Sequence, residues 1–279
     1  TRRSSDLLPQ GGASGIYYAY GAAGPESIGA KQLLPATAGK LNAILPQAKM
    51  TGEGSHLILF QEPSAANRFR LTAAVGGRGV FSGISSVAEI SGGTRGALFP
   101  ATLRRGSQLD ILYQNRAEAT LIDDIFRAFS VDRGVTWSGN LRITSNGFQN
   151  FSGKVTNTSD KLFFIWQSNP DKMWSIFAAP EGGETFRVSE NVSPSYLPAI
   201  VAGGDTVVAA WQDTRSGSPQ IYAKFLDRPD NQYVGNDHRV TKDGISAKAL
   251  EFIRLGNRPF LFYGCGPGLC LREADTTAD

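Results

Sequence analysis

Charged and amide side chains directly follow several short segments that end in an aromatic residue. These segments end at Phe60, Tyr113, Trp166 and Trp211. The polar residues selected as ligand-binding candidates are Glu62, Arg116, Glu118, Asn169, Asp213 and Arg215. Carboxylates and amides accept hydrogen bonds from hydroxyl groups, and guanidinium groups donate them, so this set suits a polar ligand such as a sugar. The alternative is that they are ordinary solvated loop residues, with Asp213 and Arg215 as a surface ion pair that braces its own loop.

The aromatic-ended segments recur at a regular interval, which indicates that they are equivalent strands of a repeated unit. With Tyr263 at the end of a fifth segment, the aromatic residues are 53, 53, 45 and 52 positions apart. Each unit has a weaker first strand, the aromatic-ended strand, a polar loop, and two further strands separated by a turn. Four short strands in a repeat of this length are typical of one blade of a β-propeller.

The repeats therefore predict an all-β fold and one domain over residues 1–279. We expect a β-propeller of six four-stranded blades, with five as the alternative, because five aromatic-ended strands but six third strands are visible. The N-terminal strands and the region 261–273 would share a blade and close the ring, which would hide an exposed strand edge. In such a fold the loops after the second strands lie on one face, where the candidate residues would surround a common funnel.

One turn between a third and a fourth strand carries a specific motif. The residues Ser130, Asp132, Gly134, Thr136 and Trp137 match the pattern S-x-D-x-G-x-T-W at every defined position. In such a turn the Asp accepts amide hydrogen bonds, the Gly supplies a positive φ, and the aromatic packs between sheets. Degraded copies occupy 179–186 and 226–233. The chain thus resembles the Asp-box, or bacterial neuraminidase repeat, family of β-propellers.

The resemblance implies a sialidase-like propeller with its ligand site on the loop-rich face. Sialidases of this family use an arginine triad, a Tyr nucleophile with a Glu partner, and an Asp acid/base. Their first arginine usually lies in an Arg-Ile-Pro motif near the N-terminus, and this sequence lacks that motif. We therefore expect a non-catalytic propeller that binds a glycan or a protein. A sialidase-like glycoside hydrolase is the alternative, and a structural subunit of an envelope or surface assembly is the second.

The distribution of charged and apolar residues bears on binding to nucleic acids and on membrane insertion. The formal net charge is only +3, and no run of Lys and Arg resembles a segment that follows a nucleic-acid backbone. No stretch approaches the roughly 20 apolar residues of a membrane span. We therefore expect neither nucleic-acid binding nor a membrane span.

The two cysteines stand on either side of a turn sequence. A hairpin at Gly266-Pro267-Gly268 would bring Cys265 and Cys270 within bridging distance, and the sequence leaves open whether they are bonded. The histidines are not spaced for a zinc site, so we expect no metal and no cofactor. The possible disulfide and the family resemblance together favour a secreted, periplasmic or cell-surface location.

Overall fold

The computed structural model describes residues 15–18, 32–34, 44–52, 55–64, 68–77, 86–89, 95–116, 121–190, 192–203, 206–226, 233–242, 247–255 and 258–274. The chain divides into two compact units. The first comprises residues 1–121 and 126–143, and the second comprises residues 122–125 and 144–279. Glu118 lies outside the described residues.

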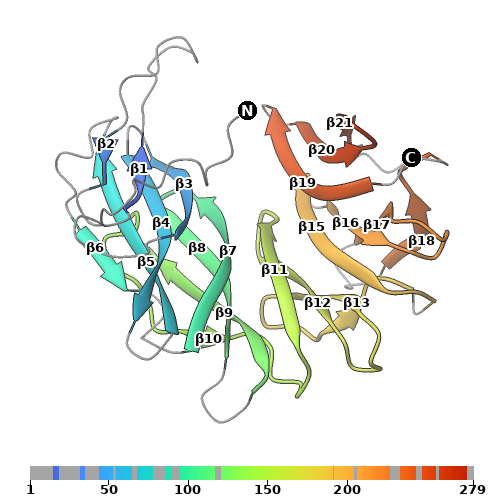
Figure 1. Cartoon of the computed structure of the whole chain (residues 1–279), viewed down its shortest axis with the longest axis horizontal. Coiled ribbons are helices and arrows are strands. Elements are labelled where there is room, and N and C mark those ends of the chain that lie inside the picture. Colours follow the sequence, from blue (N-terminus) through green and yellow to red (C-terminus); the bar gives the residue numbers. More distant parts are fainter. Residues whose placement is uncertain are drawn as a thin grey trace, which may run out of the picture. The chain divides into compact units, whose positions relative to one another are not determined.

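All regular elements in the described part are antiparallel strands (Figure 1). A two-stranded sheet joins β1 (Tyr17–Tyr18) and β2 (Gln32–Leu33). Two four-stranded sheets follow: β3 (Ile44–Gly52), β4 (Ser55–Ser64), β5 (Arg68–Gly77) and β6 (Ser86–Glu89), then β7 (Arg95–Arg105), β8 (Gln108–Arg116), β9 (Asp123–Ser130) and β10 (Leu141–Arg142).

Three more sheets complete the chain. The first holds β11 (Asn150–Asn157), β12 (Leu162–Ser168), β13 (Ser175–Pro180) and β14 (Phe186–Arg187), and the second holds β15 (Ser195–Gly203), β16 (Thr206–Asp213), β17 (Gln220–Leu226) and β18 (Tyr233–Arg239). The last has three strands in the described part: β19 (Ala247–Leu255), β20 (Arg258–Cys265) and β21 (Gly268–Glu273).

The all-β class predicted from the sequence is confirmed, and four of the sheets have four strands in chain order. Each aromatic-ended segment forms a second strand, namely β4, β8, β12, β16 or β20. The strand pairs among the described residues do not join β1 or β2 to the sheet β19–β21. Ring closure, the number of blades and the single domain therefore stay predictions.

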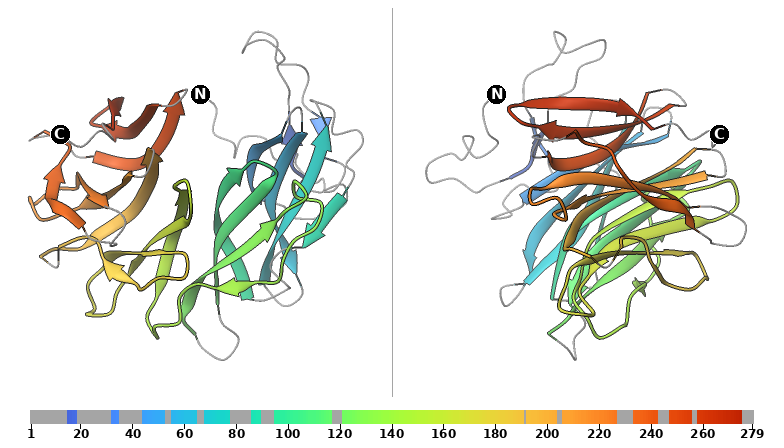
Figure 2. Two further views of the ribbon diagram at one scale, coloured as in Figure 1. Left: turned by 180° about the vertical axis from the view of Figure 1, so that it is seen from behind. Right: turned by 90° about the vertical axis from the view of Figure 1, so that its right-hand side faces the viewer.

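Neighbouring sheets within each unit pack face to face through apolar side chains. In the first unit, the sheets β3–β6 and β7–β10 lie side by side (Figure 2). Leu59 and Ala73 of the former share a core with Ile111 and Tyr113 of the latter. In the second unit, Phe163 and Ile176 meet Trp211 across the next pair of sheets. A further core joins the sheets β15–β18 and β19–β21. This burial of apolar area is the main term that stabilises stacked sheets.

The first strand of several sheets carries a β-bulge opposite the buried aromatic residue of the second strand. In the pair β15–β16, Leu197 and Pro198 lie between the register pairs Tyr196↔Gln212 and Ala199↔Ala210. Leu197 has a φ of 50°, and the residues in the corresponding position of β7 and β11, Phe99 and Ser152, have φ values of 51° and 55°. A bulge bends the strand and re-aims its side chains.

The glutamines that follow Phe60, Trp166 and Trp211 tie their strands to the first strand of the next sheet. Gln61 Nε2 donates to the carbonyl oxygen of Ala97, and Gln212 Nε2 donates to that of Ala247 at 2.8 Å. Gln167 Oε1 accepts from the backbone nitrogen of Leu197 at 2.9 Å. The amides thus reach backbone groups at or beside the bulges, where the regular ladder is interrupted.

The turn that carries the full motif is held by its own side chains. Asp132 accepts hydrogen bonds from the backbone nitrogen and the hydroxyl of Thr136 at 2.8 and 2.6 Å, and the nitrogen of Gly134 donates to Ser130 Oγ at 2.7 Å. The bonds from Thr136 lower the pKa of Asp132 from 3.8 to about 2. Gly134 has a φ of 92°, and Trp137 packs on the core of the first unit.

In three sheets, a side-chain hydroxyl just past the fourth strand accepts a hydrogen bond from a backbone nitrogen of the third strand. Thr144, Ser189 and Thr241 each lie two residues past a fourth strand. Their hydroxyl oxygens accept from the backbone nitrogens of Ile125, Ile176 and Ile221 at 3.0, 3.0 and 3.1 Å. The three sites share the pattern Arg-[Ile/Val]-[Thr/Ser], a repeat that our sequence analysis missed.

The hairpin β20–β21 contains the only two cysteines of the sequence, and they are bonded to each other. The Cα atoms of Cys265 and Cys270 are 5.9 Å apart, and the turn between them includes Gly266 with a φ of 60°. Both cysteines pack against the core that the sheets β15–β18 and β19–β21 share.

Candidate functional site

Asp213 lies at the end of β16, where it is fully buried and saturated with hydrogen bonds. Ser193 Oγ and Ser195 Oγ donate to its two carboxylate oxygens, the latter at 2.9 Å. Arg215 donates to it from the backbone nitrogen at 2.8 Å and from Nη2 at 2.8 Å. Burial would raise the pKa of Asp213, but these hydrogen bonds, those of Arg215 foremost, outweigh burial and lower it. These bonds favour the charged form of Asp213, which anchors the loop that follows it.

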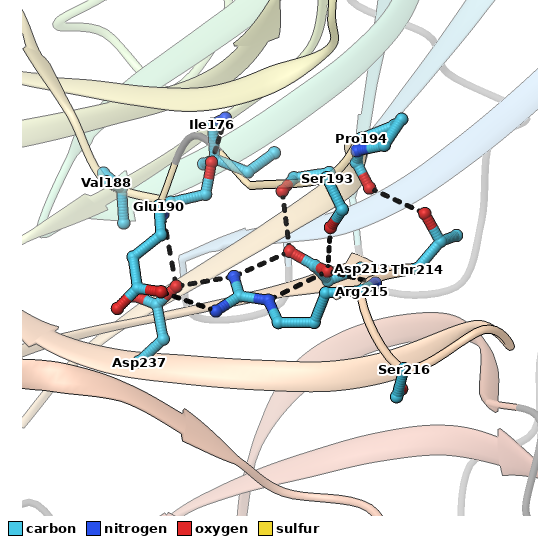
Figure 3. Close-up of polar contacts among 12 residues, drawn as sticks. Ile176, Val188, Glu190, Ser193, Pro194, Asp213, Thr214, Arg215, Ser216 and Asp237 are labelled. Atoms are coloured by element: carbon cyan, nitrogen blue, oxygen red, sulfur yellow. Dashed lines mark hydrogen bonds and ion pairs between the residues drawn. The ribbon is translucent and has the colours of Figure 1, made fainter.

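Arg215, in the loop between β16 and β17, binds three carboxylates at once (Figure 3). Its Nη1 lies 2.9 Å from Glu190 Oε2, and its Nη2 lies 2.7 Å from Asp237 Oδ2 as well as close to Asp213. Its guanidinium carbon stands 4.3 Å from the centroid of the Tyr222 ring. Burial would lower the pKa of Arg215, but its bonds to Asp213 and Asp237 raise it. The nitrogens of this guanidinium are thus paired with carboxylates of the protein itself, and one of its faces lies on Tyr222.

Lys224 completes the cluster from β17. Its Nζ lies 2.8 Å from Asp237 Oδ1 and donates to the carbonyl oxygen of Val188 at 3.1 Å. The cluster of Glu190, Asp213, Arg215, Lys224 and Asp237, here called the ionic cluster, joins the end of the sheet β11–β14 to the sheet β15–β18. Its buried charges compensate one another, which is what a bracing network requires.

A second group of side chains lies at the same end of the sheet β11–β14. The rings of Phe151 and Trp174 are in contact, with centroids 5.3 Å apart and planes tilted by 50°. Phe148, three residues before Phe151, is 39% exposed. The side-chain oxygen of Asn169 accepts from the backbone nitrogen of Gln149 at 3.2 Å. We call Phe148, Phe151, Asn169 and Trp174 the aromatic–amide patch.

The loop that presents Phe148 is held in place from both sides. The nitrogen of Phe148 donates to Asn146 Oδ1 at 3.1 Å, and its carbonyl oxygen accepts from Asn150 Nδ2 at 2.7 Å. Asn150 is fully buried and also donates to Asp124, which is fully buried as well. Gly147, with a φ of 78°, makes the turn possible. An exposed aromatic ring is therefore displayed on a pre-organised loop.

Hydrogen bonds link the aromatic–amide patch to the ionic cluster within the second unit. The carbonyl oxygen of Trp174 accepts from the nitrogen of Ser195 at 2.8 Å. The hydroxyl of Ser195 in turn binds Asp213. Loops after second strands and connections between sheets thus meet at one end of this unit, as the repeat order predicts.

The predicted candidates in the first unit have other surroundings. Glu62 lies within β4, not in a loop, because that strand continues to Ser64. It is buried, and its Oε1 binds Arg70 Nε at 2.7 Å and Thr72 Oγ1 at 3.0 Å on the neighbouring strand. Arg116 is the last residue of β8, and its nitrogen donates to the side chain of Asn115. Of the six candidates, the described structure brings Asp213 and Arg215 into direct contact and places Asn169 on the same linked end.

The sequence analysis missed several members of both groups. Glu190 and Asp237 are 25 and 22 residues from Arg215, and they come from an inter-sheet connection and a fourth strand. Such spacing carries no local signal. The Asn-Gly-Phe turn at 146–148 was readable, because Asn-Gly is a strong turn signal and an aromatic at a turn tip is unusual.

In the described part of the chain, no group of three or more His, Cys, Asp or Glu side chains could hold a metal ion. The same residues include no helix with the length and apolarity of a membrane span.

Comparisons with known proteins give similarity in fold but not in sequence. No protein-family model matches the chain, and no curated protein sequence does. An α-L-arabinofuranosidase from Lactobacillus brevis superposes with a TM-score of 0.52 and 9% identity, over 82% of this chain and 89% of that one. An endo-arabinase from Bacteroides thetaiotaomicron gives 0.51 and 10%, over 83% and 94%.

The GH93 α-L-arabinofuranosidase of Fusarium graminearum, in complex with arabinobiose, gives a TM-score of 0.53 and 12% identity, over 85% of this chain and 79% of that one. At such identities the likeness concerns the fold alone. The chain is thus similar in fold to β-propeller glycoside hydrolases.

Proposed function

We propose that this protein is a non-catalytic propeller that binds a neutral glycan at the aromatic–amide patch. The observation that carries the proposal is the exposed side chain of Phe148 on a braced loop, which is bonded to the amide of Asn169 through Gln149 and leads into the Phe151–Trp174 pair. Aromatic faces pack against the C–H groups of sugar rings, and amides bind sugar hydroxyls. Pre-organisation of the loop reduces the entropy lost on binding.

The charges around the patch favour a neutral ligand. The four side chains of the patch carry no charge at neutral pH. Arg215, the arginine of the neighbouring ionic cluster, is already bound by three carboxylates. A carboxylated sugar would have to displace one of them, at the expense of leaving a charge uncompensated.

The names of the similar structures support a carbohydrate ligand and raise hydrolysis as the second candidate. Two are arabinofuranosidases and one is an endo-arabinase. Hydrolysis by two carboxylates needs one acid whose pKa is raised, and both must reach the substrate. Asp213 has a lowered pKa and a fully buried side chain, so it fits neither requirement.

The motif turn supports a second proposal, that the chain is a diverged Asp-box propeller. The bonds from Thr136 to Asp132 and the positive φ of Gly134 agree with what that resemblance implies. The disulfide supports a secreted, periplasmic or cell-surface location, because such bonds persist in oxidising compartments.

An array of neutral and sialylated oligosaccharides, including arabino-oligosaccharides, tests the glycan proposal. We expect binding to neutral members, followed by calorimetry on the best of them. Phe148→Ala and Trp174→Ala should each weaken that binding about ten-fold or more, equal to about 1.4 kcal/mol. Leu269→Ala is the matched control, because Leu269 is 72% exposed in the same unit but outside the patch.

Three results would count against the proposal. Binding that is confined to sialylated members would contradict a neutral ligand. Equal losses in Leu269→Ala and Phe148→Ala would remove the patch from the site. Release of sugar from fluorogenic arabinofuranosides or sialosides by the purified protein would establish the hydrolase instead.

A further inference from the structure

The second unit contains a cavity between the sheets β15–β18 and β19–β21. Its volume is about 220 Å³. Apolar side chains from both sheets line it, namely Val208, Ala223, Phe225, Val240, Phe252 and Leu261. None of these belongs to the aromatic–amide patch or to the ionic cluster.

The cavity lies between two sheets that differ in their number of described strands. The sheet β15–β18 has four strands, whereas its neighbour has three in the described part of the chain. Ala223, Val240 and Phe252 are only partly buried against the core that the two sheets share. Their apolar surface therefore faces the cavity instead of a packed partner, which leaves contacts for a ligand to make.

Basic side chains surround the apolar wall. Lys224, Arg239 and Arg272 line the cavity with His238, against one acidic residue, Glu273. Lys224 is engaged by Asp237, and Glu273 is engaged by Arg258. Arg272 Nη1 donates to the carbonyl oxygen of Val240 at 2.7 Å, which is a neutral acceptor. No carboxylate among the described residues is paired with Arg272, so its positive charge is available to an anion at the cavity.

We propose that this cavity binds a small amphipathic monocarboxylate. The short apolar body lies against Phe225, Phe252 and Leu261, and the carboxylate binds the guanidinium of Arg272. Guanidinium groups match carboxylates in shape and in charge. At about 30 Å³ for each water-sized group, the volume corresponds to about seven such groups, so the ligand is a single ring or a short alkyl chain.

Calorimetry with octanoate, octanol and acetate on the full chain tests this proposal. We expect saturable binding of octanoate at one site, with octanol at least about ten-fold weaker and acetate undetected. Arg272→Gln should reduce octanoate affinity about ten-fold and leave octanol unchanged, because only the charged contact is lost. Arg272 is exposed, so the fold should tolerate the change.

Two further variants locate the site. Ala274→Phe places a ring at the lining and should abolish octanoate binding, while Arg142→Gln, an exposed arginine that does not line the cavity, should have no effect. Octanol binding equal to octanoate, non-saturable binding, or full octanoate affinity in both Arg272→Gln and Ala274→Phe would overturn the proposal. The glycan measurements on Phe148→Ala are independent of all these outcomes.

Discussion

Gln167 Oε1 accepts a hydrogen bond from the backbone nitrogen of Leu197, 2.9 Å away, and this bond crosses from one sheet to the next. It reaches the bulged residue of β15, whose φ is 50°. Replacement by Gln167→Ala removes the acceptor, and we expect a loss of about 1 kcal/mol in the free energy of unfolding. Denaturant titration measures it. Gln108→Ala is the control, because the half-buried amide of Gln108 bonds only weakly, at 3.4 Å or more, to Asp110 of its own strand. Equal losses in both variants would contradict a role for the inter-sheet bond.

Arg215 is the centre of the ionic cluster, and its replacement should strongly destabilise the folded protein. Arg215→Met keeps much of the volume but leaves buried Asp213 and Asp237 without their shared partner. We expect the free energy of unfolding to fall by about 3–5 kcal/mol. In the control, Lys154→Met removes the exposed pair with Glu251 and should cost no more than about 1 kcal/mol. Similar losses in the two variants would show that the cluster does not brace the fold.

Gly134 cannot accept a side chain without strain. Its φ is 92°, and a methyl group there would lie 3.1 Å from both Leu57 Cδ1 and Val75 Cγ2. We expect Gly134→Ala to lower the free energy of unfolding by about 1–3 kcal/mol. Gly139→Ala is the matched control, since a methyl group there meets no atom within 4 Å. An unchanged free energy of unfolding in Gly134→Ala would show that the turn relaxes to accept the methyl group.

Asp132 makes the stability of the motif turn dependent on pH. Its pKa is about 2 in the folded protein, against an ordinary 3.8, so the charged form favours folding. This contribution is present above pH 4 and is lost as the pH falls towards 2. We expect Asp132→Asn to have a lower Tm than the parent at neutral pH, with a difference that shrinks below pH 4. A constant difference across that range, in thermal unfolding followed by circular dichroism, would contradict this.

The second strands could be predicted from the sequence, whereas most contacts of the candidate site could not. Aromatic residues such as Trp166 and Trp211 mark second strands, because each must be buried opposite the bulge of its neighbour. Asp213 and Arg215 were paired from sequence because they are two residues apart. Their partners Glu190 and Asp237 were not found, since Glu190 meets Arg215 only after two sheets have packed and Asp237 only after β17 and β18 have paired. Glu62 was predicted to lie in a loop, because nothing in the residue types around it shows that β4 continues to Ser64.

The hydroxyls of Thr144, Ser189 and Thr241 have a practical consequence for engineering. Each fixes the chain just beyond the fourth strand, whatever the length of the preceding turn, which spans 131–140 in one sheet and 181–185 in another. The turn at 181–185, which lacks the full motif, can therefore tolerate an inserted peptide, such as an epitope or a fluorescent label. This turn lies at the end of the sheet β11–β14 opposite to the proposed glycan site, so a label there would leave that site uncovered.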